Sequence, residues 1–211
     1  MAMQARQPNS RNSPGVDWLI AFAGKARLSD QFRKHKDHRG LLAAGLFGEA
    51  GSVLAELKKV EREGSAYPNY HQRLLEELGD CLWYFVRLAA LADARLLDEL
   101  VLSKTPKRPA RTSQLELAAE FGTAVGQVLR SLRRKRNAEL REALLEVWWG
   151  LGAIAYRANI QLKEAAASNL EKTGSRWPER RHFHALFDDD FPAVLERDMQ
   201  FPDKSVRAPY P

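Results

Sequence analysis

The chain of 211 residues has a single cysteine, few β-branched residues and no alternating strand pattern. Because Cys81 stands alone, no intrachain disulfide can form, and a reducing compartment is expected. Ala, Leu, Glu and Arg dominate the middle of the chain, which predicts an all-α protein. Apolar residues make up 45% and charged residues 28%, the ordinary composition of a globular protein.

The sequence also lacks an apolar run close to the roughly 20 residues that cross a bilayer. Residues 1–14 lack the apolar core of a signal peptide. We therefore expect no membrane association, a cytoplasmic location and a disordered leader over residues 1–14.

Acidic side chains interrupt two otherwise apolar, helix-forming runs. Glu49 and Glu56 share one helical face with Ser52, at i, i+3 and i+7, and Glu77 and Asp80 share a face on the next run. Packed antiparallel, the two helices would turn these acids toward one point. Carboxylates that face one another repel, and a hard divalent cation relieves that repulsion. The spacing therefore predicts a metal site, with Mg²⁺ as the expected ion and Mn²⁺ as an alternative.

Glycines recur every third residue beside the first acid, at Gly45, Gly48 and Gly51. Each costs about 1 kcal/mol relative to alanine inside a helix. Such a run is tolerated where another helix or a ligand approaches the backbone, and tight helix packing is the simpler of these two interpretations.

The segment 103–113 divides the chain most clearly, because it carries two prolines, four basic residues and no large apolar residue. We expect a first helical half over 15–102, a second over 114–173, and an extended tail over 174–211. The length suits one domain or two small halves that share a core. Helices are expected at about 14–32, 40–62, 71–92, 96–102, 114–136, 138–158 and 162–172, with Asn137 as an N-cap.

A weak internal repeat relates the two halves. GSVLAELKK (51–59) matches GQVLRSLRR (126–134), and EELGDCLWYFVRLAAL (76–91) matches EALLEVWWGLGAIAYR (142–157). The second copy keeps the helical frame and loses most acids: Glu49 aligns with Ala124 and Glu77 with Ala143, whereas Asp80 keeps an acidic counterpart, Glu146. We interpret the halves as duplicated helical hairpins, of which the first retained the metal site.

GLFGEAG (45–51) and EELGDCLWY (76–84) resemble the two metal-binding motifs of the MazG-like, all-α nucleoside triphosphate pyrophosphohydrolases, and SNLEKTGSRWP (168–178) resembles that family's Asn-x-x-Lys segment. The resemblance implies Mg²⁺-dependent cleavage between the α- and β-phosphates of a nucleoside triphosphate, giving a monophosphate and pyrophosphate. It implies Glu49, Glu77 and Asp80 as metal ligands, and we expect Glu56, one turn beyond Ser52 on the same face, to reach the ion directly or through water. Glu56 or Glu76 would hold or deprotonate the attacking water. The substrate-binding candidates are Lys58, Lys59, Asn169, Lys172 and Arg176.

One position departs from the family pattern, because Ser52 stands where a second acid is expected and Glu56 would have to compensate. The alternative function is a catalytically weakened nucleotide-binding or scaffold protein of the same fold. A third alternative is a nucleic-acid or partner-binding module that uses the basic cluster over 130–136, although no nucleic-acid motif accompanies it. A homodimer is left open, because helical halves of this size can leave an apolar face uncovered.

Overall fold

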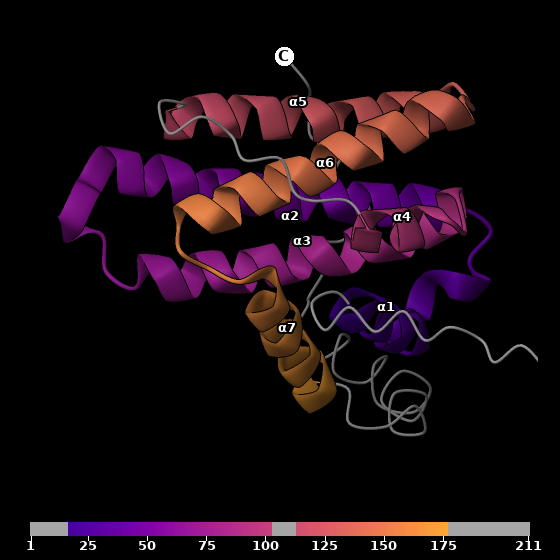
Figure 1. Ribbon diagram of the computed structural model, residues 1–211, viewed down its shortest axis with the longest axis horizontal. Coiled ribbons are helices and arrows are strands. Elements are labelled where there is room, and N and C mark those ends of the chain that lie inside the picture. Colours follow the sequence, from indigo (N-terminus) through magenta and orange to yellow (C-terminus); the bar gives the residue numbers. More distant parts are fainter. Residues whose placement is uncertain (1–16, 103–112, 177–211) are drawn as a thin grey trace, which may run out of the picture. The chain divides into compact units, whose positions relative to one another are not determined.

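The computed structural model describes residues 17–102 and 113–176, and these residues contain α-helices, two short 3-10 helices and no strand. The predicted all-α fold is confirmed. In chain order the elements are α1 (Asp17–Ser29), η1 (Gln31–Lys34), α2 (His38–Glu63), η2 (Gly64–Ala66), α3 (Tyr70–Ala92), α4 (Leu96–Leu102), α5 (Gln114–Arg133), α6 (Asn137–Arg157) and α7 (Leu162–Arg176) (Figure 1).

The chain divides into two compact units, Met1–Leu170 and Glu171–Pro211. Both helical halves fall in the first unit and share one hydrophobic core. The predicted leader, most of the predicted linker and nearly all of the predicted tail lie outside the described residues, so those boundaries stay predictions.

Two helical hairpins, α2–α3 and α5–α6, form the first unit, with α2 packed on α5 and α3 on α6 (Figure 1). Four pairs of residues that the sequence repeat aligns are fully buried in both copies: Val53 and Val128, Leu78 and Leu144, Cys81 and Val147, Phe85 and Leu151. Phe85 of one hairpin also stacks on Trp148 of the other, with ring centroids 5.8 Å apart. Positions that the repeat aligns therefore lie on the core-facing sides of both hairpins.

Local capping explains where the long helices begin and end. The Asp37 carboxylate accepts a hydrogen bond from the Gly40 amide at the start of α2, and Gly64 ends it with a φ of 57°. A capping box between Ser113 and Glu116 starts α5. The predicted N-cap Asn137 is wrong by one residue. Arg136 takes the extended cap conformation, without a side-chain bond, immediately after the left-handed turn at Lys135.

A buried ion cluster fixes the segment before α2 against α3. Asp30 Oδ2 lies 2.9 Å from Arg87 Nε and 2.7 Å from His38 Nε2. Asp30 and Arg87 are almost fully buried, and a buried carboxylate is tolerated only with such partners. The cluster therefore sets the direction in which α2 leaves the N-terminal helix.

One helical stretch, His38–Ala66, is long and apolar enough to cross a membrane, judged by length and composition only. The expectation that no run approaches this length was therefore too strong. The same stretch contributes seven buried residues to the protein interior, among them Leu46 and Glu56. A core helix of a soluble protein passes the same test, so the location of the protein stays a prediction.

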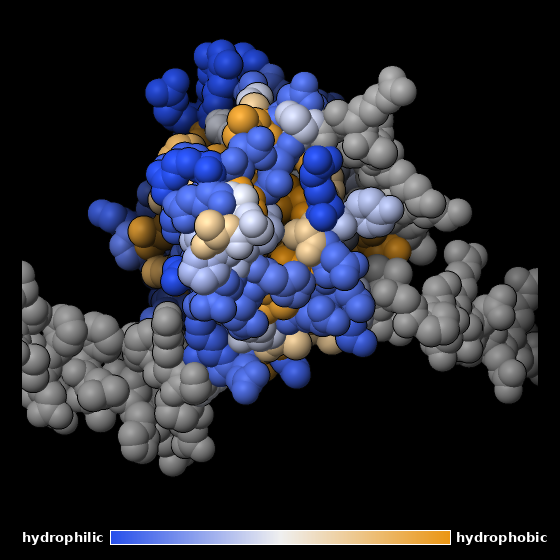
Figure 2. Space-filling model, turned by 90° about the vertical axis from the view of Figure 1, so that its left-hand side faces the viewer, coloured by the Kyte–Doolittle hydropathy of each residue, from blue (hydrophilic) through white to orange (hydrophobic). Residues whose placement is uncertain are grey.

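The face shown in Figure 2 is mostly hydrophilic, with hydrophobic residues in small separate patches. Large hydrophobic side chains that are exposed come from four different helices: Ile20, Leu28, Phe47, Leu115 and Tyr156. The basic cluster over 130–136 lies exposed at the turn from α5 to α6, where Arg136 pairs with Glu139 at 2.5 Å. The homodimer and the nucleic-acid alternative both stay untested.

Of the three glycines near Glu49, only Gly45 lies close against another helix. A Cβ at Gly45 would collide with the ring of Tyr84, whereas a Cβ at Gly48 or Gly51 would meet nothing within 4 Å. A tighter contact occurs at Gly79, where a Cβ would lie 2.5 Å from the Ala165 carbonyl oxygen of α7. Gly79 therefore allows the backbone of α7 to touch α3 directly beside Asp80.

This contact predicts opposite effects for two glycine-to-alanine substitutions. Gly79→Ala should lower the free energy of unfolding by about 1–3 kcal/mol, because backbone atoms of α7 must move. Gly126→Ala should raise it by about 0.5–1 kcal/mol, because its Cβ enters open space inside a helix. Urea denaturation of both variants measures the difference. Equal effects of the two substitutions would contradict the packing described.

Candidate metal centre

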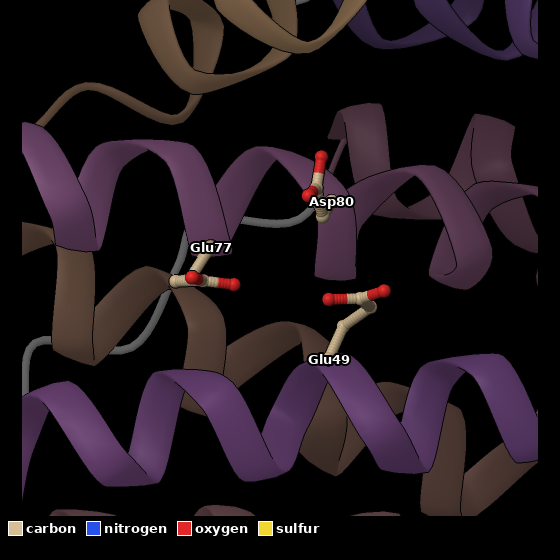
Figure 3. Close-up of side chains that lie close together, drawn as sticks. All are labelled: Glu49, Glu77 and Asp80. Atoms are coloured by element: carbon tan, nitrogen blue, oxygen red, sulfur yellow. The ribbon is translucent and has the colours of Figure 1, made fainter. Parts of the chain in front are cut away.

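Three carboxylates meet between α2 and α3. Glu49 projects from α2 toward α3, which carries Glu77 and Asp80 (Figure 3). One oxygen from each lies within 4.8 Å of the others, and all three residues are half-buried. We call these residues the acidic triad. It is the convergence that the helical spacing predicted.

Core packing on the neighbouring positions forces this convergence. Leu46 and Ala50 flank Glu49 and are buried, as are Leu78 and Cys81 beside the acids of α3. The helical period fixes where the acids lie relative to these buried residues. When the apolar side chains are buried, the acids lie at the edge of the contact between α2 and α3. The triad is therefore held in place by hydrophobic contacts and not by attraction among its members.

The carboxylates of the triad influence two neighbouring side chains electrostatically. Burial raises the pKa of the Cys81 thiol, and Glu49, Asp80 and Glu77 raise it further. Burial likewise raises the pKa of Tyr84, with added contributions from Glu49 and Asp80. Both effects have the sign expected for clustered anions. Oxygen ligands of this charge fit a hard divalent cation such as Mg²⁺ or Mn²⁺.

Asn169 of α7 contacts the triad through Asp80. Asn169 is buried, and its Nδ2 donates a hydrogen bond of 2.7 Å to Asp80 Oδ1. The contact is possible because α7 packs against Gly79, one residue before Asp80. Sequence reasoning assigned Asn169 to substrate binding, and the structure gives it a contact that orients a candidate ligand.

Glu56 lies outside the triad and makes a separate buried cluster. Its Oε1 accepts from Lys59 Nζ at 2.6 Å and its Oε2 accepts from the Tyr67 hydroxyl at 2.5 Å. Burial alone would raise the pKa of Glu56, but the hydrogen bonds from Lys59 and Tyr67 outweigh it and lower that pKa. Both carboxylate oxygens are thus engaged, which argues against Glu56 as a substitute for the acid missing at Ser52.

The remaining predicted site residues are less constrained by the structure. Glu76 and Lys58 are exposed. Lys172 and Arg176 belong to the second unit, and their part in substrate binding stays a prediction. Tyr67 was missed, because it lies in the connection after α2, where no helical spacing relates it to Glu56.

No protein-family model, curated protein or solved structure matches this chain. The resemblance to MazG-like enzymes therefore rests on the motifs of the sequence alone.

The triad predicts specific binding of a divalent cation. Calorimetric titration with Mn²⁺ should show one saturable site in the wild type, and Asp80→Asn should weaken it at least tenfold, because a ligand charge is lost. Glu146→Gln is the matched control, since it removes the aligned acid of the second hairpin. Equal loss of affinity in both variants would show that binding depends on general charge and not on the triad.

The Glu56 cluster predicts a defined pH dependence of stability. A carboxyl whose folded-state pKa is lowered stabilises the fold above its ordinary value of 4.5, and this contribution is lost as pH falls through the folded-state pKa. The difference in unfolding free energy between wild type and Glu56→Gln should be constant from about pH 7 to 5. Below that it should shrink by up to about 1.4 kcal/mol per pH unit.

Denaturation of both proteins across this range measures the effect. A difference between wild type and Glu56→Gln that grows as the pH falls would contradict the ion pair.

Proposed function

We propose that this chain is a Mg²⁺-dependent nucleoside triphosphate pyrophosphohydrolase of the MazG-like kind, which cleaves a ribo- or deoxyribonucleoside triphosphate between its α- and β-phosphates. The observation that supports this most directly is the convergence of Glu49, Glu77 and Asp80 from the two motifs. The products would be a nucleoside monophosphate and pyrophosphate.

The triad would hold the ion. Bound there, Mg²⁺ would supply charge neutralisation for the triphosphate and a means of orienting water. Without it, three clustered carboxylates would repel a polyanionic substrate. Asn169 would help to keep Asp80 in one orientation through its hydrogen bond to Oδ1.

Hydrolysis also needs a group that takes a proton from water. The water oxygen forms a bond to phosphorus, the P–O bond between the α- and β-phosphates breaks, and the proton passes to a base. Glu56 is poorly suited to this role, because its pKa is lowered and both its oxygens accept hydrogen bonds. Of the two predicted candidates, these contacts favour Glu76, next to the ligand Glu77.

Lys59, which the resemblance assigns to substrate binding, contacts Glu56 and Tyr67. Its ammonium group pairs with Glu56 and lies 5.7 Å from the centre of the Tyr67 ring. It therefore neutralises the buried Glu56 carboxylate. It also lies against Tyr67, in the connection between α2 and α3. Lys58, which is exposed, is the better candidate for a substrate phosphate.

A non-catalytic nucleotide-binding or scaffold protein is the second candidate. Ser52 supports it, because the acid expected there is missing and Glu56 is held elsewhere. The triad would bind an ion and nucleotide in either case. Turnover alone distinguishes the two functions.

Pyrophosphate release from a panel of nucleoside triphosphates with Mg²⁺ tests the proposal. We expect measurable turnover on at least one nucleotide, and a loss of about 100-fold or more in Asp80→Asn, equivalent to about 2.7 kcal/mol. Glu146→Gln should retain wild-type turnover. Asp80→Asn should also keep the wild-type fold, since relief of like-charge repulsion offsets the lost contact.

Two further variants separate an intact site from a weakened one. Ser52→Glu should raise turnover if a missing ligand limits the rate, whereas Glu56→Gln should change it little. No turnover in either the wild type or Ser52→Glu, with nucleotide binding retained, would establish the non-catalytic function. A large loss of turnover in Glu56→Gln, with the fold intact, would return Glu56 to the mechanism.

A further inference from the structure

A cavity of about 130 Å³ lies between the two hairpins, away from the acidic triad. It is lined by residues from α2, α3, α5 and α6 and by Ala158, which follows α6. Leu57, its contribution from α2, stands eight residues beyond Glu49, about 12 Å further along the helix axis. The cavity is therefore a feature of the two hairpins together and uses none of the residues assigned to hydrolysis.

The cavity has an apolar body. Leu57, Leu117, Ile154 and Ala158 form that part of its wall. An apolar cavity of roughly 150 Å³ in another protein holds a benzene molecule. A volume of about 130 Å³ thus suits a single small ring or a short branched chain, and is too small for a nucleotide.

The polar part of the wall offers donors. Gln114 Nε2 donates a hydrogen bond of 2.9 Å to the Tyr70 hydroxyl oxygen, which leaves the hydroxyl proton of Tyr70 to be donated elsewhere. Arg157, exposed at the end of α6, adds a guanidinium group to the same cavity. A ligand end that accepts hydrogen bonds and carries negative charge matches these groups.

The charges around the cavity agree with this assignment. None of the residues that line it is acidic. Glu56 is close enough to influence Tyr70 electrostatically, but its charge is compensated by the ion pair with Lys59. The lining of the cavity therefore contributes one cationic group, that of Arg157, and no anionic group.

We propose that this cavity binds a small monocarboxylate with an apolar ring or branched body. The carboxylate contacts Arg157 and the Tyr70 hydroxyl, and the body packs among Leu57, Leu117 and Ile154. The site is independent of the proposed hydrolase function, because the two share no residue. The site requires both hairpins, since each supplies part of the cavity wall.

Benzoate is the probe that tests the proposal, with benzyl alcohol as its uncharged analogue. Titration monitored by amide chemical shifts should give saturable benzoate binding, with the largest shifts around Tyr70, Gln114 and Arg157. Benzyl alcohol should bind the same site more weakly. Wild-type protein that is folded and shows no saturable benzoate binding would overturn the proposal.

Two substitutions distinguish the charged end from the apolar body. Arg157→Gln should weaken benzoate binding roughly tenfold and leave benzyl alcohol unchanged, because only an ionic hydrogen bond is lost. Ala158→Leu should weaken both probes, because it fills the space.

Arg133→Gln, at the exposed end of α5 outside the cavity lining, is the matched charge control and should bind benzoate as the wild type does. Equal weakening by Arg133→Gln and Arg157→Gln would show non-specific charge attraction and overturn the proposal. So would unchanged benzoate affinity in Arg157→Gln. Because Arg157 is exposed, this variant decides the question even if Ala158→Leu fails to fold.

Discussion

Three carboxylates held within 4.8 Å of one another are the constraint around which the first unit is organised. Like charges at this range repel, so hydrophobic packing of α2 and α3 must keep them together. Gly79 contributes by admitting the backbone of α7, which brings Asn169 to Asp80. The buried apolar contacts of α2 and α3 hold the three carboxylates close together. A divalent cation bound between them would reduce the repulsion among their charges.

The helices and the triad could be predicted from sequence because both depend on local periodicity. Spacings of i and i+3 between acids fix their common face, and the apolar residues between them fix which face is buried. The contacts of Glu56 could not be predicted in the same way. Its partner Tyr67 comes from the connection after α2, and the role of Asn169 depends on how α7 packs, so neither contact has a spacing that marks it. The Asn137 cap failed for a similar reason, since a left-handed residue at Lys135 shifts the start of α6.

The second hairpin repeats the helical pattern of the first but lacks most of its acids. Ala124 and Ala143 stand at the positions aligned with Glu49 and Glu77, and both are buried. The hairpin still contributes many residues to the core, including Trp148 against Phe85. It also contributes Gln114, Ile154 and Arg157 to the cavity between the hairpins. Within the described residues, the first hairpin thus carries the charged centre, and the second adds core surface and a distinct set of polar groups.

The central claim is that Glu49, Glu77 and Asp80 together coordinate a divalent cation. The most direct measurement is anomalous X-ray diffraction from crystals grown with Mn²⁺, collected on both sides of the manganese absorption edge. The account predicts one anomalous difference peak between α2 and α3, at about 2.0–2.3 Å from oxygens of all three residues. A peak elsewhere in the first unit, or a triad without a peak at saturating Mn²⁺, would contradict it.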